Sequence, residues 1–225
     1  MTTELKNELS SATSVRTSIR VIKQQVVGTE AMPPEADYLA IEDPLEIALN
    51  YTRENSRIER KLIVTMRTPG QDAAMIHGFL YCEGIIQKSE DITDIDFTGE
   101  NESAAPTRAT VHLRAGLDAS AASIERNFAV HSSCGVCGTT TLGHLAIPKA
   151  LRIDDESRID TELVHSLPTH MRAQQATFET TGGLHAAAIF DNNGRLEITH
   201  EDIGRHNALD KAIGTSLIAG STPGR

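Results

Sequence analysis

The sequence has no tryptophan, and only 4% of its 225 residues are aromatic. It has just three cysteines, an odd number and too few for the disulfide framework of a small secreted protein. No apolar run approaches the length of a membrane span, and the N-terminus lacks the basic start and apolar stretch of a secretion signal. These absences predict a cytoplasmic protein that does not associate with a membrane.

Basic residues are in the minority, with 21 Lys and Arg against 31 Asp and Glu, which gives a net charge of −10. A uniform basic surface for DNA or RNA is therefore absent, and we expect no nucleic-acid partner. A nucleotide-like ligand stays open, because a local group of hydrogen-bond donors can bind one. The length suits one large domain or two small ones.

The first half of the chain predicts a β-rich region with one helix. Segments rich in Ile, Val and Leu, separated by Gly and Pro, predict strands. A helix is expected at 71–81, with Asp72 in its first turn and Gly84 at the place of a C-terminal cap. The polar loop 99–106 is expected to be exposed. The predicted strands cover 18–27, 38–42, 45–51, 62–67, 91–98 and 107–114.

The second half predicts helices and strands in turn. Pro168 is expected to begin a helix, because its fixed φ suits the first helical position. Asn193-Gly194 lies between two apolar runs and predicts a β-hairpin. A final helix is expected from about Asp202 to 213. The predicted strands are 127–131, 185–190 and 195–199.

Cys134 and Cys137 form a CxxC pair in a loop whose glycines leave the backbone flexible and accessible. Four interpretations compete: two small buried residues, a zinc site, a dithiol redox centre, and a nucleophilic cysteine that holds transferable sulfur. A structural zinc site needs four ligands, and His131 and His144 lack the usual spacing. The local sequence does not separate redox work from sulfur carriage. Cys82, in a predicted helix, is expected to serve core packing.

His185 follows a Gly-Gly turn and precedes three alanines, so its surroundings are small and something can approach closely. In the last helix, Asp202 is a candidate N-cap. The apolar stripe would consist of Ala208, Leu209, Ala212 and Ile213. The opposite face would carry His206, Asn207, Asp210 and Lys211, and Arg205 would lie in the first turn.

These donors suit phosphate or a purine edge at a helix start, although a solvated charged face explains them equally well. A metal site of His185, His200 and His206 has no diagnostic spacing.

Three motifs in this order resemble one known family: CGVCG at 134–138, TGGLHAAAIF at 181–190 and EDIGRHNALDKAIG at 201–214. Upstream, 43–45, 67–70, 78–80 and 83–86 are similar as well. The family is that of the formate dehydrogenase accessory sulfurtransferases, also called FdhD sulfur carriers. The resemblance spans about 16–214, so it does not depend on one short motif.

The resemblance implies a function. Such proteins take sulfur from a cysteine desulfurase as a cysteine persulfide and deliver it to the molybdenum bis-guanine-dinucleotide cofactor for formate dehydrogenase. It implies that Cys134 carries the persulfide and that Cys137 assists. The cofactor, or a GDP-like nucleotide, is then expected to meet His185, Arg205, His206, Asn207 and Lys211. No permanently bound metal is expected. Family members are commonly homodimers.

The resemblance also implies an α/β fold, a β-rich N-terminal region followed by a mixed sheet like that of cytidine deaminases. Relatives continue well past the last helix, so we expect an incomplete deaminase-like domain with an exposed sheet edge. The expected organisation is a disordered tail at 1–14, a β-rich region at 15–131, a cysteine loop and connector at 132–160, and the partial deaminase-like domain at 161–225.

Overall fold

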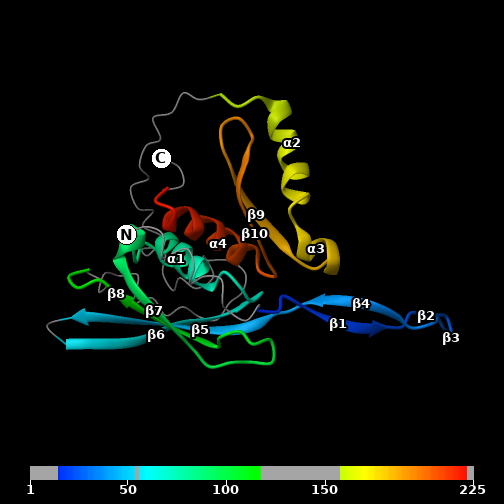
Figure 1. Ribbon diagram of the computed structural model, residues 1–225, viewed down its shortest axis with the longest axis horizontal. Coiled ribbons are helices and arrows are strands. Elements are labelled where there is room, and N and C mark those ends of the chain that lie inside the picture. Colours follow the sequence, from blue (N-terminus) through cyan, green and yellow to red (C-terminus); the bar gives the residue numbers. More distant parts are fainter. Residues whose placement is uncertain (1–14, 54–55, 118–157, 222–225) are drawn as a thin grey trace, which may run out of the picture.

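The computed structural model describes residues 15–53, 56–117 and 158–221, and it is a mixed α/β structure as predicted (Figure 1). The predicted tail at 1–14, the predicted strand at 127–131 and both cysteines of the CxxC loop lie outside the described residues. No helix in the described ranges is long and apolar enough to cross a membrane.

A four-stranded mixed sheet forms the base of the structure, with the strand order β6-β5-β8-β7. Its strands are β5 (Asp43–Arg53), β6 (Ser56–Arg67), β7 (Ile92–Thr98) and β8 (Arg108–Leu113). β5 runs parallel to β8 and antiparallel to β6, and β7 runs antiparallel to β8. A single 3₁₀ turn, η2 (Ser89–Asp91), leads into β7.

The main core lies between this sheet and helix α1 (Asp72–Cys82). Leu45, Ile47 and Leu49 of β5 are buried together with apolar residues of α1 and with Leu217 near the chain's end. The alternation along β5 directs these side chains to one face, as expected for a half-buried strand. The outer face carries charged side chains instead, including the ion-paired Glu46 and Arg108.

Helix α4 (Arg205–Ile218) packs tightly across α1 (Figure 1). Two glycines allow the close approach. A Cβ atom on Gly78 would lie 1.9 Å from the carbonyl oxygen of Asp210, and one on Gly214 would lie 1.8 Å from the carbonyl oxygen of Ala74. Both neighbours are backbone atoms that no rotamer change can move. The distance between the helices therefore depends on the absence of a side chain at both positions.

The other side of α4 contacts a hairpin of β9 (His185–Phe190) and β10 (Leu196–Asp202). The predicted Asn193-Gly194 turn is confirmed: Gly194 has a φ of +78°, and the Asp191 carboxylate accepts the N–H groups of Asn193 and Arg195. Within the described residues, these two strands form a sheet of their own. Helices α2 (Thr161–Arg172) and α3 (Ala176–Thr181) precede them.

An arm extends from the body of the molecule (Figure 1). It pairs β1 (Ser18–Lys23) with β4 (Glu35–Ala40), and the short strands β2 (Val26–Val27) and β3 (Glu30–Ala31) form its tip. Of the thirteen large apolar side chains exposed in the described residues, seven belong to this arm, so its apolar surface is largely uncovered.

Four expectations about local structure were wrong. The strand expected at 18–27 is two strands, β1 and β2. Pro168 lies inside α2, and Asp160 provides the cap by accepting the N–H of Glu162. The loop 99–106 is not simply exposed, because Ser103 is buried and donates to the Asp43 carboxylate. In α4, Leu209 is exposed while Lys211 is buried, so the buried stripe is shifted from the predicted one.

Candidate functional site

Cys134 and Cys137 lie outside the described residues. The candidate site in the described residues consists of the start of α4 and the segments around it. The N-cap of α4 is Gly204, which provides no side-chain cap for the first turn. Arg205 and His206 follow and are both exposed. The N-terminal end of a helix carries partial positive charge and unpaired N–H groups, which favours a negatively charged ligand. Arg205 adds a full positive charge.

His185 lies near this helix start. It is the first residue of β9, and its register partner on β10 is Asp202, two residues before Gly204. His185 is exposed, and the preceding turn passes through Gly182 in the left-handed region. The structure thus brings His185, Arg205 and His206 to the same end of the hairpin, although 20 positions of sequence separate the first two.

Asn207 was expected to contact the cofactor, but its side chain is hydrogen-bonded to neighbouring segments of the chain. Its side-chain N–H₂ donates to the carbonyl oxygen of Met66 at 2.8 Å and to the Asp202 carboxylate at 3.1 Å. Its amide oxygen accepts the Thr65 hydroxyl at 3.3 Å. Asn207 therefore attaches α4 to the end of β6 with most of its hydrogen-bonding groups.

Lys211 was expected on the exposed donor face, and this placement was wrong. Its side chain is 2% exposed, and its ammonium lies 2.7 Å from the carboxylate of the fully buried Asp202. It also donates to the carbonyl oxygen of Thr68 at 2.8 Å. A buried ammonium is stable only when it is paired and hydrogen-bonded, and Lys211 meets both conditions.

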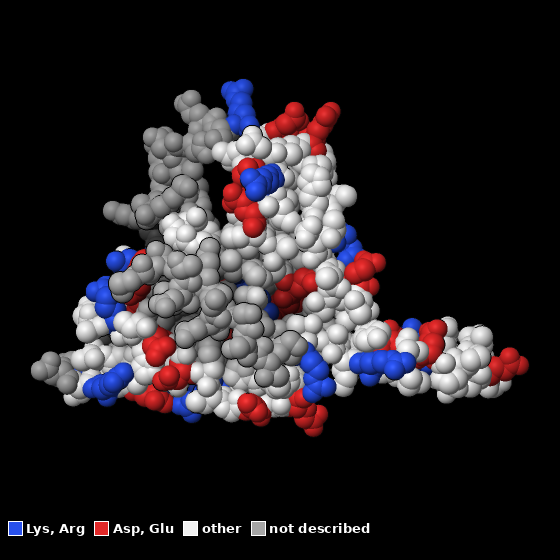
Figure 2. All heavy atoms as spheres, in the orientation of Figure 1, with Lys and Arg blue, Asp and Glu red and all other residues white. Residues whose placement is uncertain are grey.

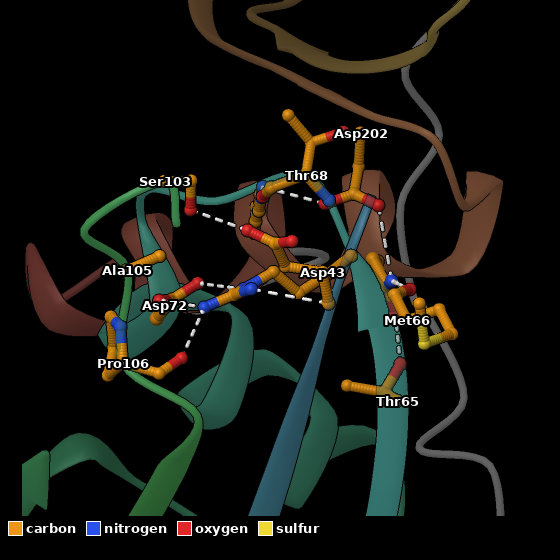
Figure 3. Close-up of polar contacts among 12 residues, drawn as sticks. Asp43, Thr65, Met66, Thr68, Asp72, Ser103, Ala105, Pro106 and Asp202 are labelled. Atoms are coloured by element: carbon orange, nitrogen blue, oxygen red, sulfur yellow. Dashed lines mark hydrogen bonds and ion pairs between the residues drawn. The ribbon is translucent and has the colours of Figure 1, made fainter. Parts of the chain in front are cut away.

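A second buried ion pair joins Arg67, the residue before Thr68 in the sequence, to Asp72, which Figure 3 labels. The guanidinium of Arg67 donates from Nε and one Nη to the two carboxylate oxygens of Asp72, each at 2.9 Å. Its remaining donors reach the carbonyl oxygens of Asp43 and Pro106. This two-point pairing suits the planar guanidinium and fixes the turn 67–70 relative to the start of α1.

Two groups at the contact between α1 and α4 have shifted pKa values. Burial, together with the nearby Glu83 and Asp202 carboxylates, raises the pKa of Asp210 to about 7. Cys82 is exposed on its outer side, yet partial burial of its thiol and the adjacent Asp210 raise its pKa to about 12. A thiol with so high a pKa is a poor nucleophile at neutral pH. The expectation that Cys82 serves core packing was wrong, because this residue is exposed.

The three histidines considered as metal ligands are not gathered in the described ranges. There, no three His, Cys, Asp or Glu side chains gather as metal ligands, so His185, His200 and His206 do not form the metal site considered from sequence. Burial lowers the pKa of His200, and its Nε2 lies 2.8 Å from the Thr215 hydroxyl. On the face shown in Figure 2, basic and acidic side chains of the described residues are interspersed.

A model described as the FdhD/NarQ family matches residues 40–225 of this chain. The chain belongs to this family. The matched range contains the CxxC loop, the hairpin and α4. The resemblance inferred from the three motifs is thereby confirmed.

Curated relatives in the FdhD/NarQ family extend the comparison. The chain is similar to the sulfur carrier protein FdhD of Streptomyces avermitilis, with 39% identity over 198 residues, which cover 86% of this chain and 67% of the relative. It is 36% identical over 199 residues to the protein of the same name from Sulfolobus acidocaldarius, covering 88% of this chain and 70% of the relative.

The fold of this FdhD/NarQ chain is similar to a crystal structure of a candidate formate dehydrogenase accessory protein from Desulfotalea psychrophila. The TM-score is 0.58 at 20% identity, and the match covers 93% of this chain and 71% of that one. The likeness concerns the fold.

Sequence reasoning missed the buried network of this family member. Arg67 was noted only as the end of a predicted strand and, with Thr68, as part of a segment similar to the family, and Asp202 only as a candidate cap. A signal did exist: charged residues stand two positions before Pro69, two positions after Gly70 and two positions before Gly204, where buried turns need side-chain partners for their backbone groups.

Proposed function

We propose that this chain is a sulfur carrier that takes sulfur from a cysteine desulfurase as a persulfide on Cys134. It then passes the sulfur to the molybdenum bis-guanine-dinucleotide cofactor that formate dehydrogenase requires. The observation that carries the proposal is the family match over 40–225, which includes the CxxC loop, together with relatives named sulfur carrier protein. The work of such a carrier suits the cytoplasm, where thiols are kept reduced.

The chemistry needs one ionised cysteine at a time. The Cys134 thiolate attacks the terminal sulfur of the desulfurase persulfide, and the desulfurase cysteine leaves as a thiolate. In a release step, the Cys137 thiolate attacks the inner sulfur of Cys134. This forms a Cys134–Cys137 disulfide and frees the terminal sulfur as sulfide, and a thiol reductant then restores both cysteines. Cys82 takes no part, because its raised pKa keeps it protonated at neutral pH.

We propose that the start of α4 binds the guanine-nucleotide part of the cofactor. Exposed Arg205, His206 and His185 gather there at an uncapped helix N-terminus, and phosphate is the ligand that such an arrangement favours. The contribution of Asn207 and Lys211 is to hold this helix in place, since their polar groups are bonded to neighbouring segments.

The proposed partners are a cysteine desulfurase, formate dehydrogenase and a second copy of the chain. The exposed apolar side chains of the β1–β4 arm support a homodimer, because two strands alone do not bury them. Light scattering of the parent chain and of an Ile22→Glu variant checks this. We expect the mass of a dimer for the parent and of a monomer for the variant.

Intact-mass measurement after incubation with a cysteine desulfurase and cysteine tests sulfur carriage. We expect the parent chain and Cys137→Ala to gain one sulfur that a thiol reductant removes, and Cys134→Ala to gain none. Cys82→Ser is the matched control and should load like the parent. Loading only on Cys137 would move the carrier role to that residue. No loading on any variant would favour a different function, either a chaperone that binds the molybdenum cofactor without transferring sulfur or a dithiol oxidoreductase.

Calorimetric titration with GDP tests the donor site separately. His206→Ala and Arg205→Ala should each weaken binding about tenfold, the loss of one charge-assisted hydrogen bond. Leu209→Ala, on an exposed part of the same helix, is the control and should bind like the parent. Equal binding by all variants would show that the helix start is a solvated face.

A further inference from the structure

The carboxylate of Asp202 has an unusually complete set of partners for one buried side chain. Oδ2 accepts the Lys211 ammonium at 2.7 Å and the backbone N–H of Thr68 at 3.1 Å. Oδ1 accepts the backbone N–H of Gly204 at 2.9 Å and the Asn207 side chain at 3.1 Å. Its donors therefore come from the turn after β6, from the turn before α4 and from α4 itself.

Thr68 completes the arrangement (Figure 3). Its hydroxyl accepts the N–H of Ile203 at 3.0 Å, and its carbonyl oxygen accepts the Lys211 ammonium at 2.8 Å. Every polar group of Thr68 is thus bonded to the chain around the start of α4. Two segments more than 130 positions apart in sequence are joined through one buried carboxylate, one ammonium and one threonine.

Stability alone does not explain this arrangement. A buried ion pair gains little free energy, because removing two charges from water offsets their attraction, and neutral residues of similar size are frequently as stable. A buried pair does impose direction, since each hydrogen bond of the carboxylate requires its donor at one place. The turn fixed in this way ends at Gly204, immediately before exposed Arg205 and His206.

We propose that Asp202 is a positioning residue which, with Lys211 and Thr68, sets the direction of the first turn of α4 and so places Arg205 and His206 for their ligand. The proposal rests on the proposed function in one respect, namely that this helix start meets a guanine nucleotide. Asp202 itself does not touch the ligand. Asp202 fixes the backbone of the first turn of α4, which carries Arg205 and His206, and the Lys211 ammonium neutralises the charge of Asp202.

The test separates positioning from stability by removing both charges together. Asp202→Asn/Lys211→Met keeps similar side-chain volumes and leaves no unpaired charge, so the thermal midpoint should stay within about 5 °C of the parent. Asparagine has one acceptor oxygen in place of two, so the backbone N–H groups of Thr68 and Gly204 can no longer both be satisfied. Leu209→Ala is the control variant.

Two readouts are measured on the full chain. In hydrogen exchange, the amides of Thr68 and Gly204, which donate to Asp202 in the parent, should exchange at least about tenfold faster in the double variant, while the amide of Ile76 in the core stays unchanged. In calorimetry, GDP should bind about tenfold more weakly, which corresponds to 1.4 kcal/mol. Unchanged exchange at Thr68 and Gly204, or unchanged GDP affinity where the parent binds, would overturn the positioning role.

Thr68→Val provides a second variant in case the double variant fails to fold. It has nearly the same shape, keeps both backbone bonds of Thr68, and removes only the hydroxyl that accepts the N–H of Ile203. Exchange at Ile203 and Gly204 should accelerate, and GDP affinity should fall; exchange at the parent's rate would contradict the proposal. If the parent chain itself binds no GDP, the proposed ligand is wrong, and the exchange data still decide whether Asp202 orders the helix start.

Discussion

Gly214→Ala perturbs the contact on which the position of α4 depends, and two opposing effects decide its outcome. In a helix interior, Ala is more favourable than Gly by about 1 kcal/mol. The added Cβ, however, would lie 1.8 Å from the carbonyl oxygen of Ala74 and 2.7 Å from the backbone nitrogen of Gly78. Both helices must move apart to relieve these contacts, because neither neighbour is a side chain.

The steric effect should exceed the gain in helix propensity. Overpacking a close contact costs about 1–3 kcal/mol and occasionally more, and separating α1 from α4 also loosens the core around Leu217. We expect a net loss of about 2 kcal/mol in the free energy of unfolding. At roughly 2–4 °C for each kcal/mol in a chain of this size, the melting temperature should fall by about 4–8 °C.

Thermal and urea unfolding followed by circular dichroism measures this effect. Gly78→Ala should behave alike, since its Cβ would lie 1.9 Å from the carbonyl oxygen of Asp210. The double variant should lose less than the sum of the single losses, because helices that have already separated accommodate the second methyl group. Leu209→Ala is the surface control. A Gly214→Ala variant that melts at or above the parent's temperature would refute the close helix contact.

Three further predictions concern charged and ionisable groups. Since burial raises the pKa of Asp210 to about 7 from an ordinary 3.8, its charge destabilises the folded state increasingly as pH rises from about 4 to about 7. Asp210→Asn should therefore have the parent's free energy of unfolding near pH 4 and a value about 1–2 kcal/mol higher above pH 7. Urea unfolding at several pH values measures this difference, and a difference that does not change with pH would contradict the prediction. Cys82 should react with iodoacetamide at pH 7.5 at least about 100-fold more slowly than a thiol of ordinary pKa. Mass spectrometry over time measures the rate, and an ordinary rate would mean that the thiol is not held protonated. Arg67→Ala should lower the free energy of unfolding by about 3–5 kcal/mol because it leaves Asp72 buried without its partner, whereas Arg67→Ala/Asp72→Ala should recover part of that loss.

Local patterns predicted most of the secondary structure. Strand β9 has the predicted bounds, α1 is displaced by one residue from the predicted helix, and the Asn193-Gly194 turn is where it was expected. These features depend on residues close in sequence, through apolar periodicity and the φ preferences of glycine and asparagine. Pro168 was misjudged because Asp160 caps the helix eight positions earlier, so Pro168 lies in the interior of α2, where a proline removes one backbone hydrogen bond of the helix.

The sequence by itself determined the family, since three motifs in a fixed order identified it, and it determined the CxxC pair and the donors at the start of the last helix. Only the tertiary structure decided which of those donors are accessible. Lys211 and Arg205 are both basic residues of α4. Because α4 packs against α1 and the turn after β6, Lys211 faces Asp202 and Thr68 in the interior. Such contacts join residues more than 130 positions apart, and they depend on the close approach that Gly78 and Gly214 allow. Helical spacing assigns a residue to a side of its helix, whereas burial depends on which other segment packs against that side.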